Sequence, residues 1–177
     1  KTETEKLITG DGFDPRTNLG PMCTVKGLET VKRHTADAVA KQARLITGGF
    51  VPQVEGFPNG YWYAPTILAD ASPDMLVMRE ETFGPAVGIA SFAGIDEAIA
   101  QANNTEYGLA AIVYSSNIHT IKRCALEIDT GNVAVNNVDA GVINAPYGGW
   151  KSSGFGREHG SEGLFEYLQS KHIRIKA

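Results

Sequence analysis

The sequence has few cysteines and no long apolar segment, and both absences exclude classes of protein. Cys23 and Cys124 are the two cysteines among 177 residues. Two thiols so far apart in the chain make neither a disulfide framework nor a CxxC metal site. No run of about eighteen apolar residues is present, and the opening KTETEKLITG lacks the apolar core of a signal peptide. We therefore predict a cytoplasmic protein in a reducing compartment, with no membrane partner.

The sequence also lacks any block of charge of one sign. Its 16 basic and 20 acidic residues give a net charge of −4, and neither sign gathers into a run that could follow a phosphate backbone or a membrane surface. The spacing of the histidines matches no metal site, and the four are His34, His119, His159 and His172. We predict no nucleic-acid partner and no metal, and we expect these histidines to lie on the surface.

The pattern of apolar residues predicts helices that alternate with strands. A chain of this length with 42% hydrophobic residues suits one domain with a sizeable core. Apolar spacing of three to four residues predicts helices between Gly20 and Gly49 and over 96–104, 117–128 and 160–168. Aliphatic and β-branched runs predict strands over 43–47, 60–68, 83–92, 109–114, 132–136 and 171–175. This alternation is typical of an α/β fold in which helices cover a parallel sheet.

A carboxylate pair beside an aromatic ring stands just before the strand predicted over 83–92, which we interpret as buried. A carboxylate at the mouth of a strand, such as Glu81, can accept hydrogen bonds from a sugar diol. An aromatic residue two positions on, Phe83, points the same way if the chain is extended. This geometry suits a ribose and its attached ring. The other interpretation is a solvated glutamate pair with Phe83 in the core.

Two further features are weaker candidates for chemistry. The glycine-rich loop over 146–158 allows close backbone approach to a ligand, but glycines also serve tight packing, and the loop lacks the strand-then-helix setting of a dinucleotide fingerprint. An activated cysteine needs a base, a helix N-terminus or a cationic neighbour. Cys23, near a predicted helix start, is better placed than Cys124, for which a structural or partly exposed thiol in the middle of a helix is the expectation.

Four segments together resemble the aldehyde dehydrogenase superfamily. Residues 80–85 match its EE-x-FGP signature, and residues 103–109 match its AN-x-TEYGL segment. Residues 131–136 match the G-x-V-x-VN strand, and residues 146–158 match PFGG-x-K-x-SG-x-GRE with Tyr147 in place of phenylalanine. The resemblance covers essentially the whole chain, in order and at the expected spacing.

The resemblance implies NAD- or NADP-dependent oxidation of a small aldehyde to a carboxylic acid, through a thiohemiacetal on cysteine. Carried over to the matching positions, Glu81 would bind the nicotinamide ribose and Phe83 would pack by the nicotinamide ring. The loop before Pro146 would line the substrate entrance, with candidate residues Asp139, Gly141, Ile143 and Tyr147. No catalytic residue is assigned, because the nucleophile, the general-base glutamate and the Rossmann-like domain are expected upstream of Lys1. The chain alone is therefore expected to be inactive.

The resemblance also implies a domain layout and an assembly. Residues 1–168 would be the distal part of the catalytic domain, and residues 169–177 an oligomerisation strand used to form dimers or tetramers. Residues 10–14 resemble the succinate-semialdehyde dehydrogenase branch, although Gly141 stands where that branch has a serine on the substrate carboxylate; lactaldehyde or another small aldehyde stays open. The competing interpretation is a non-enzymatic truncated homologue that acts as a binding or assembly module.

Overall fold

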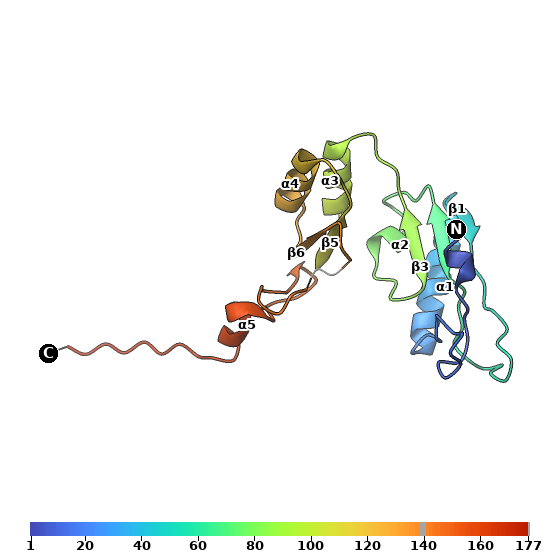
Figure 1. The fold of residues 1–177 in the computed structure, drawn as a ribbon, viewed down its shortest axis with the longest axis horizontal. Helices are drawn as coiled ribbons and strands as arrows, with labels where there is room; N and C mark the ends of the chain where they lie inside the picture. The colour runs from blue at the N-terminus through green and yellow to red at the C-terminus, as the bar shows by residue number, and fades with distance from the viewer. Residues whose placement is uncertain (139–140, 177) are drawn as a thin grey trace. The chain divides into compact units, whose positions relative to one another are not determined.

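The computed structural model describes residues 1–138 and 141–176, and the chain divides into two units, residues 1–91 and 92–177 (Figure 1). Each unit combines helices with strands, so the predicted α/β class is confirmed. The division near residue 91 is a feature that the sequence did not indicate. The predicted boundary at residue 168 stays a prediction.

The first unit contains a three-stranded sheet with helices. Strand order is β1-β2-β3, with β1 antiparallel to β2 and β2 parallel to β3. In the parallel pair, Thr66 lies opposite Ala86 and Ala69 opposite Ile89. The elements are η1 (Thr4–Lys6), α1 (Val25–Ala40), β1 (Arg44–Thr47), β2 (Thr66–Ala69), α2 (Leu76–Arg79) and β3 (Ala86–Ile89).

Helix α1 provides one wall of the core of this unit. It begins after Thr24, whose side-chain oxygen accepts a hydrogen bond from the Gly27 backbone N–H at 3.0 Å and so caps the helix. Its buried face follows helical spacing and packs in two clusters against the sheet and α2. Each fully buried aliphatic side chain contributes roughly 1.5–3 kcal/mol. The buried residues of the clusters are Leu28, Val31, Ala38, Ala43, Tyr63, Leu68, Ala71 and Met75.

The described residues of the second unit form short strands and three helices. Strands β5 and β6 pair in parallel, and β4 pairs with β7 in antiparallel fashion. Helix α4 is capped by Asn117, whose Oδ1 accepts hydrogen bonds from the backbone N–H groups of His119 and Thr120. The elements are α3 (Ile95–Asn103), β4 (Tyr107–Gly108), β5 (Ala110–Val113), α4 (Ile118–Glu127), β6 (Asn132–Val135), β7 (Trp150–Lys151) and α5 (Gly160–Phe165).

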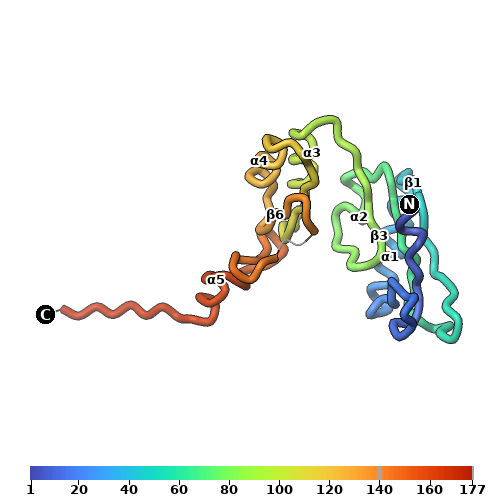
Figure 2. The backbone as a smooth tube through the Cα atoms, viewed as in Figure 1, coloured from blue at the N-terminus to red at the C-terminus, as the bar shows by residue number. Residues whose placement is uncertain are grey.

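Several predicted strands differ from the structure. The strand predicted over 60–68 pairs only from Thr66, because Pro65 has no N–H to donate to a ladder, and residues 48–65 form a long loop between β1 and β2 (Figure 2). The strand predicted over 83–92 pairs over Ala86–Ile89 and is not buried: Val87 is 50% exposed and Ile89 is 49% exposed. Parallel pairing is confirmed for β2 with β3 and for β5 with β6, whereas β1 runs antiparallel.

The tail after α5 is extended and exposed. Residues 171–175, predicted as a strand, pair with no other strand in the described part of the chain (Figure 2). A lone extended segment satisfies its backbone groups only through water or a partner, so its pairing with another subunit stays a prediction. None of the helices in residues 1–138 and 141–176 combines the length and apolar content needed to cross a bilayer.

Candidate functional site

Glu81 and Phe83 lie on one pocket of the first unit, of about 580 Å³. One side of the pocket is the segment that leads into β3, and the other is the start of α1 with the residues just before it. The sequence predicted that these two residues share a site, and the structure brings them to one pocket. The other lining residues are Leu19, Gly20, Pro21, Met22, Cys23, Thr24, Lys26, Gly27, Thr30, Tyr63, Thr82, Gly84 and Pro85.

The backbone at Phe83 turns its ring outward. Phe83 has a φ of 44°, in the left-handed region that a bulky residue rarely adopts, and the residue is 84% exposed. The next residue, Gly84, passes so close to α1 that a Cβ there would lie 3.2 Å from Val31 Cβ. Phe83 therefore lies outside the core, and the interpretation that buries it there is wrong. A strained residue with an exposed ring at a pocket is typical of a ligand contact.

Glu81 presents a carboxylate that is not engaged by the described residues. Its side chain is exposed, and among residues 1–138 and 141–176 no hydrogen bond or ion pair to that carboxylate is found. An ionised carboxylate is a strong acceptor with room for two donors. Glu81 can therefore accept hydrogen bonds from a ligand in the pocket.

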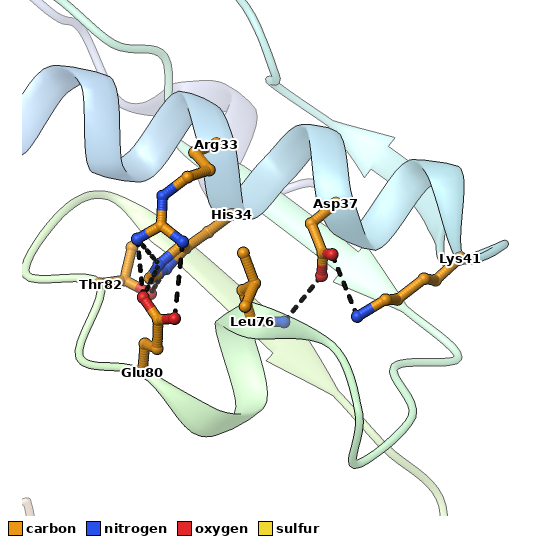
Figure 3. Close-up of polar contacts among 7 residues, drawn as sticks. All are labelled: Arg33, His34, Asp37, Lys41, Leu76, Glu80 and Thr82. Atoms are coloured by element: carbon orange, nitrogen blue, oxygen red, sulfur yellow. Dashed lines mark hydrogen bonds and ion pairs between the residues drawn. The ribbon is translucent and has the colours of Figure 1, made fainter.

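The residues on either side of Glu81 are held by helix α1 (Figure 3). Glu80 Oε2 accepts a hydrogen bond from Arg33 Nη2 at 2.6 Å and lies 3.1 Å from His34 Nε2. Thr82 Oγ1 lies 3.0 Å from His34 Nδ1. The Arg33 guanidinium, and secondarily the His34 ring, lower the pKa of Glu80 below the ordinary range of a carboxyl.

His34 is fully buried, which corrects the expectation that all four histidines lie on the surface. A signal for this was present in the sequence, because His34 falls three residues after Val31 and four before Ala38, on the buried stripe of α1. His119, His159 and His172 are exposed, as expected. No group of three or more histidine, cysteine, aspartate or glutamate side chains in the described residues is arranged to hold a metal ion.

The predicted substrate-entrance residues are brought together only in part. Ile143 and Tyr147 line a pocket of about 860 Å³ beside the glycine-rich loop. Gly141 is half-buried and does not line that pocket, and Asp139 lies outside the described residues. Tyr147 and Glu158 exchange backbone hydrogen bonds of 2.8 and 2.7 Å, which fixes the loop at this end.

Glycines in this loop serve tight packing, one of the two uses weighed from the sequence. A Cβ at Gly148 would lie 2.6 Å from the Gly156 carbonyl oxygen, and a Cβ at Gly131, the residue before β6, would collide with the Gly148 carbonyl oxygen. Asn132 also holds the loop, because its side-chain amide donates hydrogen bonds to the carbonyl oxygens of Leu109 and Gly148. The loop is thus held against β6 by backbone proximity that only glycine allows.

The two cysteines occupy different environments. Cys124 is buried in α4 with 6% exposure, which confirms the expected structural thiol. Cys23 is exposed and lines the same pocket as Glu81 and Phe83. Sequence reasoning did not place Cys23 beside those two residues.

Comparison with known proteins gives a consistent family. Residues 1–173 match the aldehyde dehydrogenase family. The structure of betaine aldehyde dehydrogenase from Staphylococcus aureus in complex with NAD+ is 37% identical, with a TM-score of 0.91 over 97% of this chain and 34% of that chain. The structure of a 3,6-anhydro-L-galactose dehydrogenase in complex with NADP is 33% identical, with a TM-score of 0.90 over 95% of this chain and 35% of that chain. The chain spans about a third of the length of these relatives, and it belongs to the aldehyde dehydrogenase family.

Proposed function

We propose that these 177 residues work as the C-terminal part of an NAD- or NADP-dependent aldehyde dehydrogenase, in a longer protein that we call the complete enzyme. The observation that carries the proposal is the pocket on which an unengaged carboxylate, Glu81, stands beside an exposed ring, Phe83. The complexes of two relatives with NAD+ and NADP support a nicotinamide cofactor. The nucleophilic cysteine is proposed to lie outside these residues.

The pocket residues fit the nicotinamide end of such a cofactor. Glu81 accepts hydrogen bonds from the ribose hydroxyls, and Phe83 packs by the nicotinamide ring. When bound, the cofactor accepts the hydride that leaves the substrate. These residues contribute the orientation of the nicotinamide ring. Holding that ring in place removes part of the entropic barrier to hydride transfer.

The proposed substrate is a small aldehyde, which reaches the reacting centre past Ile143 and Tyr147. Succinate semialdehyde is the specific candidate from the sequence, and the relative that acts on betaine aldehyde supports a small aldehyde more generally. Gly141 offers no side-chain donor to a substrate carboxylate. This absence weakens the succinate-semialdehyde assignment, because a site that hydrogen-bonds its substrate discriminates through such donors.

The extended tail supports a homo-oligomer. Residues 171–175 alternate basic and aliphatic side chains and have an unpaired backbone in the described chain. An edge of this kind can add to a sheet of another subunit. We propose a dimer or tetramer assembled through it.

The decisive experiment compares the complete enzyme with the 177-residue chain. Reduction of NAD or NADP is followed by absorbance, with a panel of small aldehydes that includes succinate semialdehyde, betaine aldehyde and lactaldehyde. We expect turnover by the complete enzyme and none by the 177-residue chain. A complete protein that is folded but turns over no aldehyde with either cofactor would favour the alternative, a non-enzymatic binding or assembly module.

A further inference from the structure

The position of Glu81 must be set by its neighbours in the chain. Its carboxylate has no partner of its own among the described residues, so nothing on the side chain itself fixes where it points. Glu80 has an extended backbone, with φ of −105° and ψ of 151°. In an extended chain, successive side chains point to opposite sides. Glu80 and Thr82 point toward His34 on α1 (Figure 3). Glu81, between them, lines the pocket.

One buried imidazole holds both neighbours of Glu81. His34 Nε2 lies 3.1 Å from Glu80 Oε2, which can only accept a hydrogen bond, and 3.2 Å from Arg33 Nη2, which can only donate one. His34 Nδ1 lies 3.0 Å from the Thr82 hydroxyl, which can either donate or accept, so this hydrogen bond forms in either tautomer of the ring. Each ring nitrogen therefore has a hydrogen-bonding neighbour. A buried, fully bonded ring has one orientation, so it fixes the spacing between Glu80 and Thr82.

The His34 ring belongs to a helix that is packed into the core of the first unit. His34 belongs to α1, between the buried residues Val31 and Ala38 that join the helix to the sheet. Arg33, at the preceding position of the helix, also holds Glu80, because its Nη2 donates a 2.6 Å hydrogen bond to Glu80 Oε2. Helix α1 thus holds residues 80–82 through hydrogen bonds from two adjacent residues, Arg33 and His34.

We propose that His34 and Thr82 are positioning residues for the cofactor site. They hold the segment so that Glu81 faces the nicotinamide ribose and Phe83 keeps its outward turn. His34 does not line the pocket and touches no ligand there. It acts through Glu80 and Thr82. This inference rests on the proposed function, because it assigns His34 and Thr82 a role in the site that Glu81 and Phe83 form.

The test uses the complete enzyme and two variants at Thr82. Thr82→Val keeps the shape of the side chain and removes the hydroxyl that bonds to His34 Nδ1, whereas Thr82→Ser keeps the hydroxyl. The dissociation constant of NAD and of NADP is measured by fluorescence titration, alongside KM for the aldehyde and the melting temperature. We expect Thr82→Val to weaken cofactor binding by about tenfold, or ~1.4 kcal/mol, with the aldehyde KM unchanged. Thr82→Ser should restore binding to near the wild-type value.

Because Thr82 also lines the pocket, a second variant removes the bond from the other side. His34→Gln changes a residue that does not line the pocket, so an effect on the cofactor must pass through the segment. If both residues act through one hydrogen bond, the double variant should bind the cofactor about as weakly as Thr82→Val alone, rather than showing the product of the two effects. His119→Gln, at an exposed histidine on α4, is the matched control and should bind like the wild type.

The outcomes separate this inference from the proposed function. A folded wild-type enzyme that binds neither NAD nor NADP would overturn the proposed function, and the inference with it. A wild-type enzyme that binds the cofactor, with Thr82→Val and His34→Gln that bind it equally well, would overturn the inference alone. Variants that lower the melting temperature and leave the cofactor dissociation constant unchanged would show that the network is structural only, which also overturns the inference.

Discussion

Replacing Phe83 by glycine should separate ligand binding from folding stability. Phe83 combines a φ of 44° with a residue exposure of 84%. Glycine adopts the left-handed region without the penalty that a side chain carries there. The substitution removes the ring from the pocket and, at the same time, relieves the backbone. Replacing a buried core residue by glycine would instead lower the free energy of unfolding and leave ligand binding unchanged.

The expected change in the free energy of unfolding is small because its components oppose one another. About a sixth of the residue's surface is removed from water in the fold, roughly 30 Å² of the ~200 Å² of a fully buried phenylalanine, so the lost burial costs ~0.8 kcal/mol. The extra freedom of glycine in the unfolded chain costs a further ~0.5–1 kcal/mol. Relief of the left-handed backbone returns roughly 1–2 kcal/mol. The net effect should lie within about 1 kcal/mol of the wild type.

Urea unfolding of the wild type and of Phe83→Gly gives the free energy of unfolding of each. Fluorescence titration of the complete enzyme gives the cofactor dissociation constant. We expect binding to weaken by about twofold to tenfold, the scale of one aromatic stacking contact. Phe13→Gly is the matched control, because Phe13 is 97% exposed, lies outside the pocket and has no left-handed backbone to relieve. A loss of about 3–5 kcal/mol in Phe83→Gly, the cost of emptying a core site, would refute the reasoning.

Three further predictions concern the carboxylates and the tail. In the complete enzyme, Glu81→Gln should slow turnover by roughly tenfold to a hundredfold, since a charge-assisted hydrogen bond of about 1.5–3 kcal/mol is weakened; unchanged steady-state and single-turnover rates would remove Glu81 from the site. The lowered pKa of Glu80 means that its contacts stabilise the fold above the ordinary range of a glutamate carboxyl and are lost as the pH falls through the lowered pKa. Glu80→Gln should therefore flatten the acid side of a plot of melting temperature against pH, by a small amount because the carboxylate is half-exposed. Deleting residues from Lys171 onward should give a smaller or insoluble protein, and light scattering that finds the same soluble oligomer would contradict the proposed role of the tail.

Local sequence patterns predicted most of the helices and the parallel pairs because those elements depend on spacing within the chain. The helix between Gly20 and Gly49 is present as α1, and the strands predicted over 109–114 and 132–136 pair as β5 and β6. The same reasoning gave a buried strand over 83–92, and Val87 and Ile89 are instead half-exposed. Apolar composition shows that a strand can be buried, but what covers it is decided elsewhere in the fold.

Two of the pocket residues could be predicted from the sequence, whereas the residues that hold them in place could not. The spacing of Glu81 and Phe83 suggested a shared site, and both line one pocket. The outward turn of Phe83 depends on the close passage of Gly84 by Val31, a contact between segments about fifty residues apart that no local pattern reveals. The support from His34 depends likewise on how α1 lies over residues 80–82. Periodicity put His34 on the buried face, but only the fold shows which residues it bonds.

The last prediction is that the 177-residue chain oxidises no aldehyde with NAD or NADP, and that a cysteine-directed aldehyde analogue labels neither thiol selectively. Cys124 is buried in α4, and Cys23, though exposed on the pocket, has no hydrogen-bond partner for its sulfur in the described chain that would act as a base. Glu81 and Phe83 alone offer a fraction of the cofactor contacts, too few to offset the entropy lost on association. Absorbance assays of the purified chain and of Cys23→Ser test this directly. Robust cofactor-dependent turnover that Cys23→Ser abolishes would place the nucleophile in this pocket and overturn the assignment of catalysis to residues outside the chain.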